Sequence, residues 1–292
     1  MSVHYPVNGA VGEIRHPSSA TLSSVHARSA LFDLYGDHLV ARGGWAPISA
    51  VVGLLGSLDI SAPAVRTAVS RMVREGWLEP EERDVRGYAA SARARARLEE
   101  AHVRIYRTAP TPWDGHWHVV TVEHQADRNT RARVAQSLRF LGYGALATDT
   151  WVAPRESPEL VEVLRREDVA HDAFTARFQG EGSALVSRVW DLTSLAAAYR
   201  RFAEAAGEAG VPDDPEQAFA SRSGLVHAWR LFLFSDPGLP EEVLPERWPG
   251  REAAALFDRQ AQALMPQASA WVDAWLGDGP GAGTGQQRGS GA

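Results

Sequence analysis

The sequence predicts an α+β protein with an N-terminal winged helix-turn-helix, a central ferredoxin-like domain and a C-terminal helical domain. Three observations lead to this fold class. Three short helical patterns and a hairpin pattern open the chain, strand and helix patterns alternate in the middle, and only helical patterns follow residue 191. With 292 residues and 45% hydrophobic content, the chain is long enough for two or three such cores.

The N-terminal domain, expected over residues 25–107, begins with two helical patterns. The first covers residues 30–39 and is interrupted by two glycines, and the second covers residues 45–58. Only Asp59 and Ile60 separate the second pattern from a third. Three short helices with such a tight second connection are typical of a helix-turn-helix.

The third helical pattern, residues 61–76, is the most informative segment of the chain. Ser61 is a good N-cap because its hydroxyl can accept from a backbone N–H of the first turn, and Pro63 fits that turn. At about 100° per residue, the helix has two different sides. The apolar side carries Val65, Ala68, Val69, Met72 and Val73. The polar side carries Arg66, Thr67, Ser70, Arg71 and Arg74.

A helix of this kind suits the major groove of DNA, which admits one helix and offers phosphates and guanine to arginine. The alternative is an ordinary amphipathic surface helix, but the flanking segments favour DNA. Residues 77–79 indicate a strand, residues 80–86 a charged loop and residues 87–89 a returning strand, which together make a wing. We expect its side chains to contact phosphate or the minor groove. The predicted DNA-binding residues are Ser61, Arg66, Thr67, Ser70, Arg71, Arg74, Arg83, Arg86 and Tyr88.

A linker helix is predicted at residues 91–107, and a proline-stiffened boundary follows. The central domain, residues 108–190, shows a strand at 117–123, a helix at 128–141, a strand at 145–153, a helix at 157–166 and an extended piece at 173–178. This alternation predicts a small ferredoxin-like domain.

The C-terminal domain, residues 191–276, shows helical patterns that begin at Asp191 or Thr193, at residue 215 and at residue 251. The apolar run that ends near residue 234 indicates a core or interface helix. Residues 1–24 and 277–292 have the composition of a disordered arm and a flexible tail.

Composition excludes several classes of site. The chain has no cysteine, so it has no disulfide, thiolate metal site or cysteine nucleophile. No apolar run approaches the roughly 20 residues of a membrane span, and no secretory signal is visible, so we expect a cytoplasmic protein without membrane contact. Net charge is −6, yet residues 23–107 hold 12 Arg against 10 acidic residues, whereas residues 108–292 hold 17 against 25. The predicted DNA-binding part is therefore mildly basic and the rest acidic.

Four segments of this chain resemble the PaaX family, the bacterial repressors of the phenylacetic-acid-degradation type. They are RSALFDLYGD, AVRTAVSRMVREGWL, PTPWDGHWHVV and WRLFLFSDPGLPEEVLPERWPGREAAALF. They occur in the order of the family, and the similarity spans about residues 28–276. The resemblance implies a winged helix, a central ferredoxin-like domain related to the Cas2 nuclease fold and a helical C-terminal domain.

The resemblance also implies a homodimer that binds double-stranded operator DNA and represses catabolic genes. It implies release by a small-molecule effector, an acyl-CoA thioester such as phenylacetyl-CoA, and no other cofactor. Such an effector needs an apolar slot for its acyl group and arginines for its phosphates. Candidate effector residues are Arg139, Tyr143, Trp151, Arg188 and Trp190.

No catalytic site is predicted, because the chain has no Walker loop, no GxGxxG after a strand and no HExxH. A polar strand face is a better explanation than a metal site for His116, His118 and His124. Glu123 and Asp127 are the only carboxylates placed for a Cas2-type metal-dependent nuclease. A nuclease and a protein-interaction adaptor that does not bind DNA stay open as alternative functions.

Overall fold

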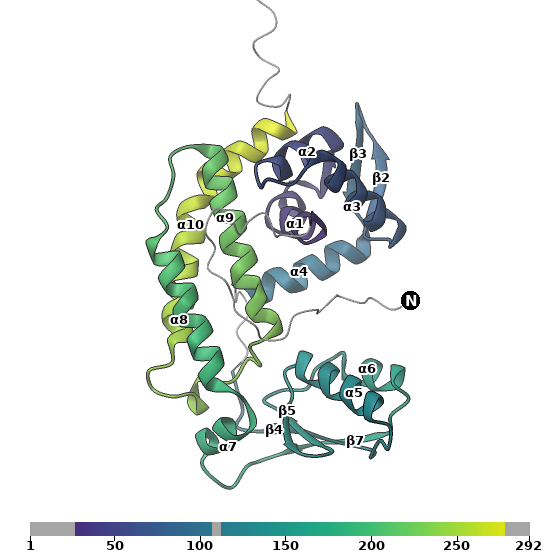
Figure 1. Cartoon of the computed structure of the whole chain (residues 1–292), viewed down its shortest axis with the longest axis vertical. Coiled ribbons are helices and arrows are strands. Elements are labelled where there is room, and N and C mark those ends of the chain that lie inside the picture. The colour runs from purple at the N-terminus through teal and green to yellow at the C-terminus, as the bar shows by residue number, and fades with distance from the viewer. Residues whose placement is uncertain (1–26, 107–111, 278–292) are drawn as a thin grey trace, which may run out of the picture.

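The computed structural model describes residues 27–106 and 112–277 (Figure 1). The predicted arm at 1–24, most of the proline-stiffened boundary and the tail beyond residue 277 lie outside the described residues. Helices and two antiparallel sheets make up the described chain, so the mixed helix and sheet architecture is confirmed.

The first helical segment begins earlier than predicted and changes its pitch. α1 (Ala27–Leu34) continues into a π-helical turn, η2 (Tyr35–Leu39), and a 3-10 turn, η3 (Val40–Arg42). Gly43 then ends the segment in the left-handed region at φ 89°.

The predicted helix at 45–58 was wrong in its first turn. A short strand, β1 (Trp45–Pro47), precedes α2 (Ile48–Gly56), and Pro47 itself is extended. A proline disfavours helical backbone at the residue before it, so the helix begins only after Pro47. α3 (Ala62–Arg74) follows after the tight connection that the sequence predicted.

The first sheet has the strand order β1-β3-β2, with β2 (Leu78–Glu82) and β3 (Arg86–Ala90) as an antiparallel hairpin. The predicted loop at 80–86 was therefore too long, because only residues 83–85 connect the strands. Pro80 is tolerated in β2 because this strand is an edge of the sheet, where a missing donor costs little. α4 (Ala92–Tyr106) comes next, and the Ser91 hydroxyl accepts from the Ala94 N–H at 3.1 Å.

The central region places two helices on one face of a four-stranded sheet. Its elements are β4 (Trp117–Val122), α5 (Arg128–Phe140), β5 (Gly144–Ala147), β6 (Thr150–Ala153), α6 (Leu160–Arg166) and β7 (His171–Ala176). The strand order is β5-β6-β4-β7. The single strand predicted at 145–153 was wrong: it is a hairpin, because a turn at Thr148 and Asp149 reverses the chain.

Side chains alternate across this sheet and form two small cores. Val120, Trp151 and Tyr143 pack with α5 and α6, whereas Trp117 and Val152 pack on the other face with α7 (Gly182–Val189). The sequence did not predict α7.

The C-terminal region is helical, as predicted. It contains α8 (Leu192–Glu208), α9 (Pro215–Arg230), the 3-10 turns η4 (Leu231–Phe234) and η5 (Glu241–Val243), and α10 (Pro249–Leu276). Asp191 and Asp214 cap α8 and α9, since their carboxylates accept from the N–H groups of Ser194 and Gln217. Within the described residues, no helix has the length and apolar character needed to cross a membrane.

The C-terminal helices also complete the N-terminal core. Phe219 of α9 and Ala268 and Val272 of α10 belong to the same buried cluster as α1, α2 and α3. In Figure 1, α9 and α10 lie beside the N-terminal helices, and the central sheet lies at the opposite end of the molecule. α3 therefore packs on a core formed by residues of the N-terminal helices together with residues of α9 and α10.

Candidate nucleic-acid interface

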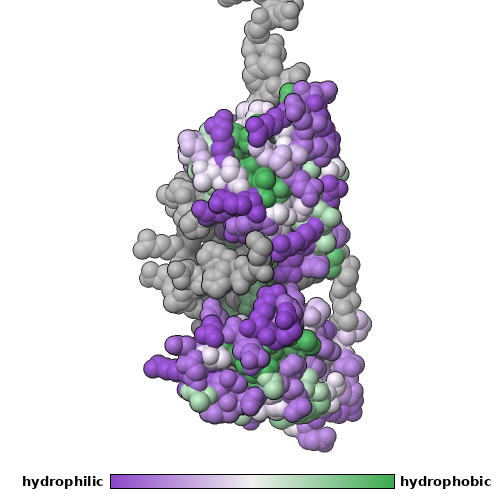
Figure 2. Space-filling view, turned by 90° about the vertical axis from the view of Figure 1, so that its right-hand side faces the viewer, coloured by the Kyte–Doolittle hydropathy of each residue, from purple (hydrophilic) through white to green (hydrophobic). Residues whose placement is uncertain are grey.

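α3 has the two sides that its sequence predicted. Its core-facing residues, Val65, Ala68, Val69 and Met72, are buried. The solvent-facing ones, Ser61, Arg66, Thr67, Ser70, Arg71 and Arg74, are all exposed. Figure 2 shows the side of the molecule on which α3 and the β2–β3 hairpin lie in Figure 1, and hydrophilic residues cover most of its described surface there.

Ser61 caps α3 by its backbone and not by its hydroxyl, so this detail of the prediction was wrong. The residue is extended (φ −63°, ψ 145°), and its carbonyl accepts from the Val65 N–H at 3.0 Å. The hydroxyl makes no cap hydrogen bond. Pro63, at the second helical position, has no N–H to donate, but the Ala64 N–H three residues after Ser61 remains, so the proline alone does not explain the missing cap.

The arginines of α3 have no partner of their own. Within the described part of the chain, the side chains of Arg66, Arg71 and Arg74 make no ion pair or hydrogen bond. α3 itself contains no acidic residue, so its exposed face is cationic. Thr67 differs, because its hydroxyl donates to the Pro63 carbonyl at 2.8 Å. The guanidinium groups are thus free for an external anion.

The β2–β3 hairpin, predicted to be a wing, has a different charge from α3. Arg83 lies in the turn, where it pairs with Glu81 at 2.7 Å and stacks over the Trp45 ring at 4.6 Å. Arg86 is exposed and sits opposite Glu82 in the ladder. Tyr88 is half-buried, and its carbonyl accepts from the Tyr35 hydroxyl at 2.9 Å. Additional acidic residues on the hairpin are Glu79 and Asp84. The hairpin is therefore net acidic, and Arg86 is its freest cation.

α4 carries Arg93, Arg95, Arg97 and Arg104, and each of the first three has an internal partner. The Arg93 guanidinium lies 4.4 Å from the Trp77 ring, and Arg95 Nε donates to the Ala90 carbonyl at 2.9 Å. Arg97 pairs with Glu100 at 2.9 Å and with Glu159 of the central region at 3.2 Å. Through these contacts, α4 interacts with Trp77, with the end of β3 and with the central region.

The C-terminal end of α10 packs against α2. A Cβ on Gly53 would lie 2.2 Å from the Trp275 ring, so only glycine permits this approach. Trp271 Nε1 donates to the Ser57 hydroxyl at 3.1 Å, and Arg42 pairs with Asp273 at 2.7 Å. α2 and the helix after it are therefore fixed to the C-terminal region.

A buried polar cluster, which we call the Arg222 junction, joins four elements behind α1. Arg222 of α9 is 1% exposed and binds both carboxylate oxygens of Asp37 in η2 at 2.7 Å. The Tyr106 hydroxyl of α4 donates to Asp37 at 2.6 Å and accepts from Arg222 at 2.8 Å. Arg222 also donates to the Ala261 carbonyl of α10. A buried guanidinium satisfied on all sides fixes these segments relative to one another.

His38 lies beside this junction and is 1% exposed. Its Nε2 is 3.2 Å from an Asp37 oxygen, and burial lowers the pKa of His38 to about 4. Burial opposes ionisation of Asp37 as well, but His38 and Arg222 outweigh it, so the pKa of the Asp37 carboxyl is below its ordinary value. Asp37 is therefore ionised and His38 neutral at pH 7.

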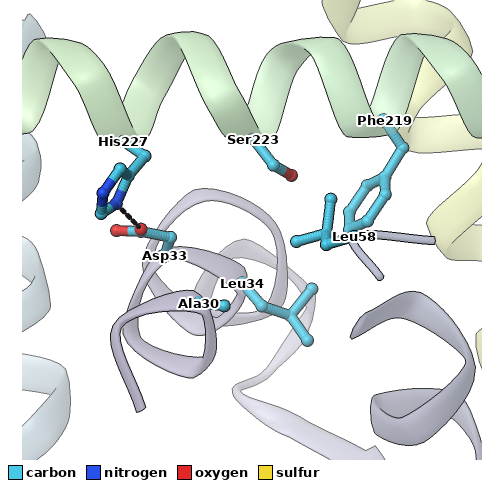
Figure 3. A pocket seen from close by; sticks show the side chains of 7 residues that line it. All are labelled: Ala30, Asp33, Leu34, Leu58, Phe219, Ser223 and His227. Carbon is cyan, nitrogen blue, oxygen red and sulfur yellow. Dashed lines mark hydrogen bonds and ion pairs between the residues drawn. The ribbon is translucent and has the colours of Figure 1, made fainter. Parts of the chain in front are cut away.

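A small hollow lies between α1 and α9 and belongs to the same contact (Figure 3). His227 and Ser223 of α9 point toward α1, where Asp33 accepts from the His227 ring at 3.1 Å. Arg230 pairs with the other Asp33 oxygen at 2.9 Å. The hollow has a volume of about 10 Å³, room for about one water molecule, so it is a packing feature and not a ligand site.

Three domain families match this chain one after another. They are "PaaX-like protein" at residues 26–94, "PaaX protein central Cas2-like domain" at 110–185 and "PaaX-like protein C-terminal domain" at 190–274. The curated "Transcriptional repressor PaaX" of Escherichia coli is 32% identical over 275 residues, which cover 89% of this chain and 86% of that protein. The chain belongs to the PaaX family. The resemblance found in the sequence is thereby confirmed.

A solved structure is similar to this PaaX-family chain over nearly its whole length. It is an uncharacterized protein from Mycobacterium tuberculosis, with a TM-score of 0.61 and 27% identity. The match covers 86% of this chain and 99% of that one. The PaaX-family chain therefore shares its arrangement of elements with a distant relative.

The five candidate effector residues of this PaaX-family protein do not form one site. The Arg139 guanidinium lies 5.4 Å from the Trp151 ring, and both residues line a cleft between α5 and the β5–β6 hairpin. Trp190 lies on the opposite face of the sheet, where its ring stacks 6.0 Å from that of Trp117. Arg188, which is exposed, is on α7 on that same face.

Tyr143, the fifth candidate, is buried beneath α5 and α6. Its hydroxyl is 2.7 Å from His118 Nδ1, and burial raises the pKa of Tyr143 to about 12. Burial also lowers the pKa of His118. The hydrogen bond between Tyr143 and His118 satisfies two buried polar groups, so no metal is needed to explain why His118 is buried.

The other residues considered for the alternative metal and nuclease sites have local roles. His124 lies 2.8 Å from Asp149, His116 lies 3.3 Å from Asp114, and the Asp127 carboxylate caps α5 through the Thr130 N–H at 2.7 Å. Glu123 is exposed. Across residues 27–106 and 112–277, no group of three or more His, Cys, Asp or Glu side chains is arranged to hold a metal ion.

Sequence reasoning missed the Arg222 junction. Asp37 and Arg222 are 185 positions apart, and each one alone has the pattern of an ordinary surface charge. Asp37 does end the first segment that resembles the PaaX family, which was the only available signal.

Proposed function

We propose that this PaaX-family protein is a DNA-binding transcriptional repressor of a catabolic operon, with α3 as the helix that enters the major groove. The observation that supports this most directly is the exposed face of α3, where three arginine side chains have no partner among residues 27–106 and 112–277. The name of the Escherichia coli relative points the same way. A repressor of this kind acts in the cytoplasm and carries out no catalysis.

The N-terminal unit works as a winged helix-turn-helix over about residues 25–107. α2 and α3 form the motif, and the β2–β3 hairpin is the wing. Ser61, Thr67 and Ser70 contact the backbone or base edges, and Arg66, Arg71 and Arg74 reach phosphates or guanine. On the wing, Arg86 and Tyr88 lie closer to the duplex than Arg83, which is held by Glu81 and Trp45.

The remaining units serve assembly and control. The central domain, residues 108–190, has the βαββαβ order of a ferredoxin-like fold, and residues 191–276 form the helical domain. A homodimer places two copies of α3 in successive major grooves about 34 Å apart, which suits a palindromic operator.

An acyl-CoA thioester or a related small organic acid releases the DNA. The mechanism is linkage: the effector binds more tightly to a conformer whose two α3 helices are misplaced, so the population shifts away from DNA. The rigid Arg222 junction favours this mechanism, because a movement of α9 carries the N-terminal unit with it.

The test is a gel-shift assay with the DNA upstream of the protein's own gene. Replacing Arg66→Ala or Arg71→Ala should each cost about 1–3 kcal/mol of binding, a loss of roughly 5- to 150-fold. Arg200→Ala is the matched control, because Arg200 is an exposed arginine on α8, away from α3. Unchanged binding by both α3 variants would reject this interface, and loss of binding by the control would point to nonspecific charge.

A further inference from the structure

The cleft between α5 and the β5–β6 hairpin is large enough for a ligand. Its volume is about 630 Å³, within the range of small-molecule sites. Ala132 and Ala135 of α5 face Ala145 and Ala147 of the hairpin, and these short side chains leave the cleft open. Apolar residues of the central core, among them Val122 and Val134, form its floor.

One face of α5 supplies the cleft with cations. Arg128, Arg131 and Arg139 line it and recur at spacings that place them on one side of the helix. Arg131 is held in place, because it donates to the carbonyls of Gln125 and Ala126 at 2.7 and 3.1 Å. Within residues 27–106 and 112–277, neither Arg128 nor Arg139 has an ion-pair partner. By contrast, Arg133 of the same helix lies outside the cleft and pairs with Glu167 at 2.8 Å.

The floor of the cleft holds a polar group with no partner. Trp151 is 4% exposed, and its indole N–H makes no hydrogen bond with any described residue. An unpaired buried donor is costly, and native proteins satisfy nearly all such groups. Trp151 lines the cleft, so a small movement of its ring would bring this buried N–H within reach of an oxygen atom of a bound ligand.

The strand end of the cleft is acidic. Glu123 and Asp149 lie there, and Asp149 is 2.8 Å from His124. Carboxylates accept hydrogen bonds from ligand hydroxyl or amino groups, whereas guanidinium groups bind phosphate. The ligand that suits this cleft is therefore anionic at one end and rich in hydrogen-bond donors at the other.

We infer that this cleft binds a nucleotide-like organic phosphate. Its phosphate groups lie against Arg128 and Arg139, an oxygen accepts from the Trp151 N–H, and its ribose or amino donors face Glu123 and Asp149. Coenzyme A contains an adenosine bisphosphate and so fits the same description. Binding in the cleft is independent of DNA, but its role as the releasing signal rests on the proposed function.

Isothermal titration of the full chain tests the inference. The probes are the adenosine bisphosphate portion of coenzyme A, coenzyme A itself, inorganic phosphate and a single-stranded oligonucleotide. We expect both nucleotide probes to bind the parent protein more tightly than inorganic phosphate does. Arg128→Gln and Arg139→Gln should each weaken nucleotide binding about tenfold, since each removes a charge-assisted contact. Arg133→Gln is the matched control and should stay within about twofold of the parent.

Three results would overturn the inference: no nucleotide binding by the parent, equal weakening by Arg133→Gln, or binding of the oligonucleotide without the mononucleotide. Thermal melting shows whether each variant is folded. A gel-shift with operator DNA in the absence of nucleotide separates the two proposals. If the parent binds nucleotide but not DNA, the proposed DNA-binding function is wrong and nucleotide binding by the cleft is supported. If it binds DNA but no nucleotide, only the inference that the cleft is a nucleotide site is wrong.

Discussion

The exposed face of α3 and the Arg222 junction use the same side chain in opposite ways. On α3, three arginines extend into solvent and form no ion pair with any described residue, since the adjacent Glu75 pairs with Arg28. At the junction, one arginine is 1% exposed and fully engaged by Asp37, Tyr106 and the Ala261 carbonyl. α4 is intermediate, because Arg93, Arg95 and Arg97 reach the surface but have local partners.

This difference shows that the partner of an arginine, and not its presence, decides what it does. All 30 basic residues of this chain are arginine, and the net charge is −6, so neither number identifies a DNA-binding surface. What distinguishes α3 is the absence of acidic residues along it together with exposure. A free guanidinium adds affinity for phosphate, whereas a buried, paired one fixes the fold.

The largest expected effect comes from removing the buried guanidinium. Arg222→Met should lower the free energy of unfolding by about 3–5 kcal/mol, because Asp37 would be left as a buried carboxylate without its counter-ion. Urea denaturation followed by tryptophan fluorescence measures this change. Arg66→Met, the matched exposed variant, should change stability by less than about 0.5 kcal/mol. Equal stability changes in the two variants would contradict the contrast drawn here.

A smaller effect is expected from acidification of the same junction. The pKa of His38 is about 4 in the folded protein against an ordinary 6.5, so between these values the unfolded chain binds a proton that the folded one does not. The free energy of unfolding should therefore fall as the pH drops from about 6.5 to about 4. The lowered pKa of Asp37 adds a loss in the same direction at still lower pH.

Urea denaturation at several pH values measures this dependence, and His38→Leu is the variant that isolates it. The charged groups that face His38 are Asp37, Arg222, Arg42 and Asp273, and all of them remain in the variant. Its stability should change less with pH over this window than that of the parent. A parallel pH dependence in the two proteins would show that other groups are responsible.

The smallest expected effect is on the salt dependence of DNA binding, and it distinguishes the arginines of α3 from those of α4. Arg71→Ala should reduce the slope of log binding constant against log salt concentration by about one, since one phosphate contact is lost. Arg95→Ala removes a bond to the Ala90 carbonyl and should leave this slope unchanged. Filter binding or fluorescence anisotropy across a salt series measures both slopes. If Arg95→Ala changes the slope as much as Arg71→Ala does, α4 contacts DNA as well.

Local patterns were predicted well wherever neighbouring residues decide the structure. The two sides of α3 follow from helical periodicity alone, and the predicted cap at Asp191 involves Ser194, only three positions away. The errors are also local in origin. Pro47 delays α2, and the turn at residues 148–149 divides one expected strand into two.

The candidate sites could be predicted only in part. The exposure of Arg66, Arg71 and Arg74 follows from their side of the helix. The pairing of Arg139 with Trp151, and the separation of both from Trp190, depend on which face of the sheet each residue occupies. Because side chains alternate between faces, that assignment requires the strand order and register.

The sequence by itself determined the family, the helices and strands in outline, and an amphipathic α3 with a cationic face. Only the tertiary structure decided which arginines are free, because the carboxylates that engage Arg222, Arg97 and Arg42 come from distant parts of the chain. Periodicity reports how a residue lies relative to its own helix. Ion pairing and burial depend on what the rest of the fold places beside it, and a guanidinium has the same sequence signature in both situations.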